Sequence, residues 1–140
     1  MTNSSLASSY LRKAQARLKT LPVLHAEGAY SDVVREAQEI VELALKAMLR
    51  QVGVEPPKWH DVGNLLLEHA ARFDARVRRR IPRMARTSRW LRKERELSFY
   101  GDIDFIPSDE YGPKDAMRAA AQAAFIVETA LLVIGENSPR

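Results

Sequence analysis

The sequence contains no cysteine. Disulfide bonds, thiolate nucleophiles and zinc–thiolate sites are therefore excluded, and such a composition is typical of a reducing compartment. Residues 1–10 are rich in serine and lack the apolar stretch of a signal peptide. We therefore expect a cytoplasmic protein.

Histidines and ligand-binding motifs are also scarce. The three histidines are His25, His60 and His69, and no two of them have the His-x-x-x-His spacing that binds metal ions on a helix. The chain also lacks a glycine-rich phosphate loop, a Gly-x-Ser-x-Gly motif and a Walker motif. The sequence therefore predicts no metal site and no cofactor.

No long hydrophobic run is present. The most apolar region, residues 119–134, is interrupted by Gln122, Glu128 and Thr129. A membrane-spanning helix needs about 20 consecutive, mostly apolar residues. We therefore expect a soluble protein with no membrane-spanning segment.

Positive charge is concentrated in one part of the chain. The net charge is +4, yet residues 72–95 hold eleven Lys or Arg and two acids, which gives this window +9 and the remainder −5. Arg76, Arg79, Arg83 and Arg86 have helical spacing, which favours a row of phosphate contacts. No aromatic residue lies between 75 and 88, so platforms for base stacking are missing. The alternatives are a solvated face or a face that docks an acidic partner.

Apolar residues recur at steps of three and four throughout the chain, which predicts helices. The first is expected to begin at Ser4 or Ser5 and to end before Pro22, with a connection through Gly28. The second, and clearest, begins after a cap at Ser31 and ends at Gly53. Its apolar face is wide enough for a central helix.

The remaining helices follow from caps and breakers. Asp61 is a plausible N-cap for a third helix. Pro82 interrupts the apolar pattern, which predicts a short or kinked helix over 75–86 and a separate helix over 88–99. The last helix is expected between Pro113 and Gly135. With no strand pattern of useful length, the sequence predicts one all-α domain over residues 1–140, an antiparallel up-and-down bundle of about five helices.

Several segments together resemble a known family. Residues 37–49 read AQEIVELALKAML, and a turn with the sequence His60-Asp61-Val62 follows. Gly28-Ala29-Tyr30 stands upstream, and Phe99-Tyr100-Gly101-Asp102 precedes a long alanine-rich helix. Over residues 6–135 this layout resembles the HEPN domain family of prokaryotes.

The resemblance implies an up-and-down helical bundle that is usually a homodimer. Many such proteins stand beside a small nucleotidyltransferase in a two-component module, and a large subset are metal-independent ribonuclease toxins. Their activity goes with an Arg, four to six residues, and then a His, on a helix at the dimer interface. In modules with the nucleotidyltransferase, a Tyr two residues after that His can accept an adenylyl group from the partner.

The present sequence departs from that motif, because none of its histidines follows an Arg at the required spacing. If Tyr100 matches the family tyrosine, the His position falls on Ser98 and the Arg position on Lys93. Alternatively, Arg95 and four residues precede Tyr100, which then occupies the His position. Histidine titrates near neutral pH and suits proton transfer, whereas serine does not and tyrosine has a reference pKa of about 10.

These observations favour a dimeric HEPN-type protein that binds RNA or nucleotide phosphate and a nucleotidyltransferase antitoxin partner, as in a toxin–antitoxin module. We expect it to be catalytically weak or silent. The residues predicted to bind phosphate are Arg83, Arg86, Arg89, Arg92, Lys93 and Arg95. One alternative is a metal-independent ribonuclease toxin with a variant site built on Arg95 and Tyr100. Another is a purely structural module for protein interaction.

Overall fold

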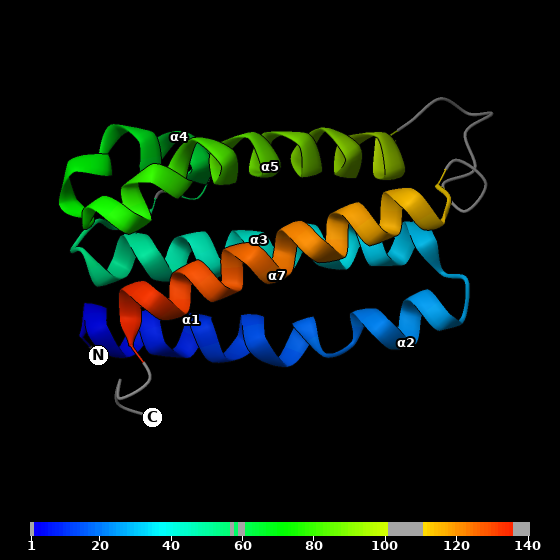
Figure 1. Cartoon of the computed structure of the whole chain (residues 1–140), viewed down its shortest axis with the longest axis horizontal. Helices are drawn as coiled ribbons and strands as arrows, with labels where there is room; N and C mark the ends of the chain where they lie inside the picture. Colours follow the sequence, from blue (N-terminus) through cyan, green and yellow to red (C-terminus); the bar gives the residue numbers. More distant parts are fainter. Residues whose placement is uncertain (1, 57, 59–60, 101–110, 136–140) are drawn as a thin grey trace.

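The structure is a computed structural model that describes residues 2–56, 58, 61–100 and 111–135, and for residues 95–100 it describes the backbone alone. This part of the chain forms four long helices, α1 (Asn3–Leu18), α3 (Tyr30–Gln51), α5 (Ala75–Tyr100) and α7 (Pro113–Ile134). It also contains the short helices α2 (Leu21–Ala26) and α4 (Val62–Glu68) and a 3-10 turn, η1 (Ala70–Arg72). Successive long helices run in opposite directions (Figure 1). The predicted all-α antiparallel bundle is confirmed.

Helix α3 lies at the centre of the bundle, as its wide apolar face predicts. It packs against α1, α2, α4, α5 and α7. Its side chains Ile40, Leu45 and Met48 are fully buried. Facing it, α7 contributes a row of small buried residues, Ala116, Ala119 and Ala123. Small side chains let two helix backbones approach closely, so the alanine-rich helix can pack along most of α3.

Two helix starts differ from the sequence-based expectation. Thr2, and not Ser4 or Ser5, caps α1: its hydroxyl accepts a hydrogen bond from the Ser5 N–H at 3.1 Å, and the Ser5 hydroxyl accepts one from the Thr2 N–H at 3.1 Å. This reciprocal pair is a capping box, which satisfies two helix-end donors at once. In α3 the Ala29 carbonyl already accepts a bond from the Val33 N–H at 3.0 Å. The helix therefore begins before Ser31, which does not cap it.

The segment expected to be a connection after Pro22 is partly helical. Helix α2 contains Pro22 in its first turn, where the missing N–H would have no helical partner in any case. Leu21 is buried in the core and holds this turn against the bundle. A proline near the end of one helix can therefore also open the next.

The separate helix predicted over 88–99 is wrong, because α5 continues through Pro82 to Tyr100 as one helix. A proline inside a helix costs about 3 kcal/mol, since it removes a hydrogen bond and crowds the preceding turn. Pro82 is exposed, while its neighbours Ile81 and Met84 are fully buried. Burying each of these side chains contributes roughly 1.5–3 kcal/mol, which offsets the proline cost.

The predicted caps around α4 and at two helix ends are confirmed. The Asp61 carboxylate accepts bonds from the N–H groups of Gly63 at 3.0 Å and Asn64 at 3.4 Å. Gly53 and Gly135 follow α3 and α7 with φ of 83° and 88°, a backbone conformation that favours glycine. Gly63 has a different role: a Cβ there would lie 3.1 Å from the Ala85 Cα, so glycine permits α4 to approach α5 closely.

Helix α7 is long and apolar enough, by length and composition, to cross a membrane. The core helix of a folded bundle has the same composition. Here one side of α7 packs against α1, α3 and α5 (Figure 1). Its inward positions Ile126 and Ala130 are fully buried among these helices. The helix therefore serves as a core element of the bundle.

Candidate functional site

Helix α5 carries a dense row of cations. Those whose side chains the structure describes are Arg76, Arg78, Arg79, Arg80, Arg83, Arg86, Arg89, Arg92 and Lys93. All except the half-buried Arg80 are exposed. Within the described part of the chain, only Arg92 among them forms an ion pair with a carboxylate. Like charges at three- and four-residue spacing repel by about 0.2–0.5 kcal/mol per pair, so an anionic ligand would stabilise this helix.

The predicted phosphate-binding residues do not all share one side of α5. Each residue advances the helix by about 100°, so Arg83 and Arg92, nine residues apart, point to opposite flanks. Arg83 contacts α7, whereas Arg92 contacts the Asp61 cap of α4. Exposed Arg89 and Lys93 lie on the outward side between the two flanks. The sequence-based set therefore divides into a flank beside α7, an outward surface and a flank beside α4.

On the α7 flank, polar and aromatic contacts hold the arginines. The Arg83 Nε donates a hydrogen bond to Gln122 Oε1 at 3.1 Å, and the Thr87 hydroxyl donates to the same oxygen at 3.2 Å. The Arg83 guanidinium carbon also lies 3.6 Å from the centroid of the Phe125 ring. One turn earlier, Arg80 Nη1 donates to the Thr129 hydroxyl at 3.2 Å. These contacts fix the orientation of the side chains before any ligand arrives.

A polar pocket of about 320 Å³ opens between α5 and α7. It is lined by Arg83, Arg86, Thr87, Arg118 and Gln122. Sequence reasoning missed Arg118, because it lies on α7, far along the chain from the basic window. Its guanidinium carbon lies 4.0 Å from the Trp90 ring centroid. The available signal was an arginine within the alanine-rich stretch over residues 116–124.

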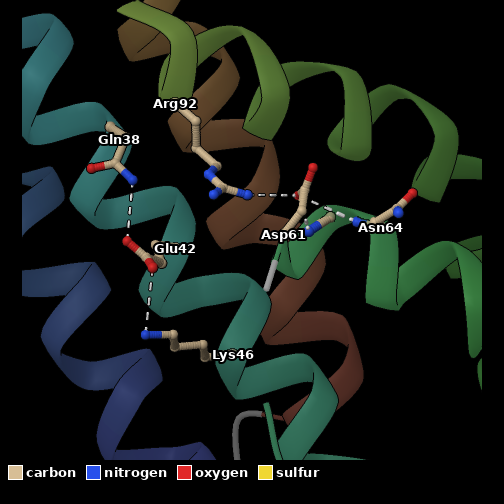
Figure 2. A network of polar contacts seen from close by, with 7 residues as sticks. Gln38, Glu42, Lys46, Asp61, Asn64 and Arg92 are labelled. Carbon is tan, nitrogen blue, oxygen red and sulfur yellow. Dashed lines mark hydrogen bonds and ion pairs between the residues drawn. The ribbon is translucent and has the colours of Figure 1, made fainter. Parts of the chain in front are cut away.

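On the opposite flank, Arg92 already has a carboxylate partner. Figure 2 shows the Arg92 guanidinium directed at Asp61, with Arg92 Nη1 3.6 Å from Asp61 Oδ1. Along α3, Gln38 donates a hydrogen bond to Glu42 at 3.1 Å, and Lys46 Nζ lies 3.5 Å from the other Glu42 oxygen (Figure 2). Because Arg92 has an intramolecular partner, it is less available to a ligand than the arginines beside α7.

Contacts at the far end of α5 involve a tyrosine that sequence reasoning did not single out. Buried Tyr111 donates a hydrogen bond from its hydroxyl to Glu94 Oε2 at 2.7 Å. This contact ties the segment just before α7 to α5. The predicted catalytic pair Arg95 and Tyr100 belongs to the last turns of α5, and their side chains lie outside the described residues.

Neither of the two described histidines lies on the arginine-bearing helix. His25 packs edge-on against Tyr30, with ring centroids 5.2 Å apart. His69 lies at the C-terminal end of α4. His60 lies outside the described residues. Among the side chains that the structure does describe, no three of His, Asp or Glu are grouped closely enough to hold a metal ion.

A second surface, of apolar character, lies between α1, α2 and α7. It is a groove of about 580 Å³ lined by Leu18, Leu21, Pro22, His25, Ala26, Met117, Ala120 and Ala124. Met117 is 61% exposed. On α7, Gln122 and Ala124 are two residues apart and so point to nearly opposite sides. The apolar groove and the polar pocket are therefore separate surfaces.

Comparison with known proteins supports one family. No curated protein matches the chain. The family model of the HEPN domain matches residues 7–134, which includes every helix described above almost completely. This agrees with the resemblance read from the sequence. The chain therefore belongs to the HEPN domain family.

Proposed function

We propose that this HEPN protein binds the phosphate groups of RNA or of a nucleotide through the exposed arginines of α5. One observation carries the proposal: eight of the nine described cations on this helix have no carboxylate partner within the described part of the chain. A structural surface would be expected to intersperse acids among so many cations. Phosphates supply the missing negative charge and release counterions on binding.

The shape of the basic surface favours a phosphate backbone over bases. From Arg76 to Lys93 the helix extends about 26 Å, at about 1.5 Å per residue, which suits several successive phosphates. Two aromatic rings beside these cations each have a guanidinium over one face: Arg83 lies over Phe125 and Arg118 over Trp90. Because these rings do not offer that face to a base, we expect binding to depend on charge and little on base sequence.

In this proposal the protein is catalytically weak or silent. Metal-free RNA cleavage needs a side chain that accepts a proton near neutral pH, and histidine is the usual one. Neither His25 nor His69 stands on α5 or bonds to one of its described arginines. An active ribonuclease that uses Arg95 and Tyr100 is the alternative that the experiment below separates from simple binding.

The proposal also includes the compartment, oligomeric state and partner that family membership suggests. We place the protein in the cytoplasm as a homodimer that works beside a small nucleotidyltransferase in a toxin–antitoxin pair. Light scattering during gel filtration tests the dimer, because it measures whether the particle has the 15.8 kDa mass of one chain or twice that mass. A mass of one chain at every concentration would contradict it. Incubation with such a nucleotidyltransferase and ATP then tests whether Tyr100 is modified.

Fluorescence anisotropy with a short single-stranded RNA tests the proposal. The doubly substituted Arg79→Gln/Arg89→Gln protein lacks two outward charges. The Lys13→Gln/Lys19→Gln protein makes the same charge change in α1 and at its C-cap. We expect weaker binding in the first and near-normal binding in the second. Equal effects of the two variants would contradict the proposal, and absence of RNA binding by the unmodified protein would remove RNA as the ligand.

The same samples, with a chelator present, report on cleavage. Intact RNA after long incubation agrees with a silent protein. RNA fragments that disappear in Arg95→Ala and Tyr100→Phe would instead establish the ribonuclease alternative. If an acidic protein but no RNA binds, and salt weakens that binding, the basic surface belongs to a structural interaction module.

A further inference from the structure

The pocket between α5 and α7 brings three guanidinium groups together. Arg83 and Arg86 come from α5 and Arg118 from α7, with the Thr87 hydroxyl and the Gln122 amide between them. The lining contains no carboxylate, and no described carboxylate forms an ion pair with any of the three arginines. Three like charges around one cavity repel one another, so the arrangement favours an anionic occupant.

Two of the three guanidinium groups are held in place. Arg83 rests on the Phe125 ring at 3.6 Å and donates from Nε to Gln122, so its two terminal nitrogens are left for a ligand. Arg118 rests on the Trp90 ring at 4.0 Å. Side chains that are already ordered lose less conformational entropy on binding. The planar guanidinium fork also matches the geometry of phosphate oxygens.

The third guanidinium, that of Arg86, can bind the ligand without first losing another contact. Arg86 is exposed and makes no hydrogen bond or ion pair with another described residue. The Oε1 atom of Gln122 is taken by Arg83 and Thr87, which leaves the Gln122 amide N–H groups as further donors. The pocket therefore presents donors from two helices and strong positive charge, which is the chemistry of a phosphate site.

We propose that this pocket binds a terminal phosphate monoester, either of a free nucleotide or of an RNA 5′ end. This inference rests on the proposed function and narrows it to one subsite. A monoester carries close to two negative charges near neutral pH, whereas each phosphate inside an RNA strand carries one. The volume of about 320 Å³ lies at the lower end of ligand pockets, which suits a ligand no larger than a mononucleotide.

The positions of two aromatic rings indicate that the pocket does not select between bases. Phe125 and Trp90 each have a guanidinium over the ring, so neither offers that face to a base. Selection should follow the number of phosphate charges and not the identity of the base. Adenine and guanine nucleotides with equal phosphate chains should therefore bind alike, and inorganic pyrophosphate should compete with both.

Calorimetric titration tests the proposal with pyrophosphate, ADP and GDP, and with an RNA that carries either a 5′ phosphate or a 5′ hydroxyl. Arg118→Gln is the informative variant, because Arg118 is exposed and its loss should not unfold the bundle. Lys13→Gln on α1 is the control with the same charge change. Circular dichroism confirms that both variants remain helical.

We expect pyrophosphate and both nucleotides to bind with similar affinity, or the 5′-phosphorylated RNA to bind more tightly than its 5′-hydroxyl form. Arg118→Gln should weaken that binding about tenfold or more, as expected for the loss of a charge-assisted hydrogen bond. Lys13→Gln should leave it unchanged. If pyrophosphate and the nucleotides bind more tightly than the RNA, the terminal phosphate comes from a free nucleotide. If the 5′-phosphorylated RNA binds more tightly, it comes from the RNA end.

Three results would overturn the proposal: no binding of any terminal phosphate, equal affinity for the two RNAs with no nucleotide binding, or no effect of Arg118→Gln. These failures differ from failure of the proposed function. Equal binding of both RNAs that still depends on Arg79 and Arg89 would retain phosphate binding by α5 and remove only the pocket. Pyrophosphate binding without RNA binding would retain the pocket and remove RNA as the ligand.

Discussion

The Arg83 guanidinium of α5 lies over the Phe125 ring of α7, with its central carbon 3.6 Å from the ring centroid. This contact joins the basic helix to the alanine-rich helix that forms part of the core. It also leaves the charge of Arg83 at the mouth of a pocket shared with Arg86 and Arg118. One pair of residues therefore contributes both to helix packing and to the candidate phosphate site.

A double-mutant cycle measures the Arg83–Phe125 contact. We expect Arg83→Gln and Phe125→Leu to be coupled by about 0.5–1 kcal/mol in the free energy of unfolding, which is typical of an exposed cation–π pair. Urea denaturation of the two single variants and the double variant gives this value. Arg86→Gln with Phe125→Leu is the matched control, and it should show no coupling. Equal coupling in both cycles would contradict a specific contact.

Gly63 sets the distance between α4 and α5. In Gly63→Ala the new methyl group would lie 3.1 Å from the Ala85 Cα and the Ser88 Cβ, so the helices must move apart. We expect a loss of about 1–3 kcal/mol in the free energy of unfolding, as for other overpacked contacts. Gly112→Ala, where nothing lies within 4 Å, should cost less, because it loses only the preference for glycine over alanine at the N-cap of α7. Equal melting temperatures for both variants would exclude this close approach.

Asp61 has two roles that substitutions can separate. Asn retains an oxygen for capping α4 but removes the charge that pairs with Arg92, whereas Ala removes both. We expect Asp61→Ala to lower the free energy of unfolding by about 1 kcal/mol, and Asp61→Asn to lower it by clearly less. Thermal denaturation at matched salt provides the comparison. An equal loss in Asp61→Asn and Asp61→Ala would show that the ion pair, and not the cap, dominates.

Pro82 is an exposed proline inside a continuous helix, so its removal should stabilise the protein. Pro82→Ala restores a backbone N–H to the α5 ladder and relieves crowding with the preceding turn. We expect a higher free energy of unfolding, by up to about 3 kcal/mol. Chemical denaturation measures it, with Pro22→Ala in the first turn of α2 as a control that should gain little. Destabilisation of Pro82→Ala would mean that α5 is not continuous at this residue.

Much of the fold follows from the sequence because its signals are local. The periodic apolar residues of α3, the Asp61 cap and the glycines after α3 and α7 each act within a few residues, and the structure confirms them. The separate helix expected after Pro82 is wrong for the opposite reason. Whether a proline breaks a helix depends on tertiary burial of its neighbours Ile81 and Met84, which no local pattern reports.

The candidate site could be predicted only in part. The basic window pointed to α5, because charge density is visible in composition. Its cations are divided among an outward surface and two flanks. The neighbour that each side chain contacts decides the flank: Gln122 for Arg83, and Asp61 for Arg92. Arg118 comes from a different helix, so only the packing of α5 on α7 brings it to the pocket.

Salt dependence of RNA binding tests the central claim most directly. Each phosphate neutralised on a single strand contributes about −0.7 to the slope of log affinity against log salt concentration. We predict a steep negative slope for the unmodified protein, a slope shallower by about 1.4 for Arg79→Gln/Arg89→Gln, and an unchanged slope for Lys13→Gln/Lys19→Gln. Affinity that does not vary with salt, or identical slopes for all three proteins, would contradict phosphate binding by α5.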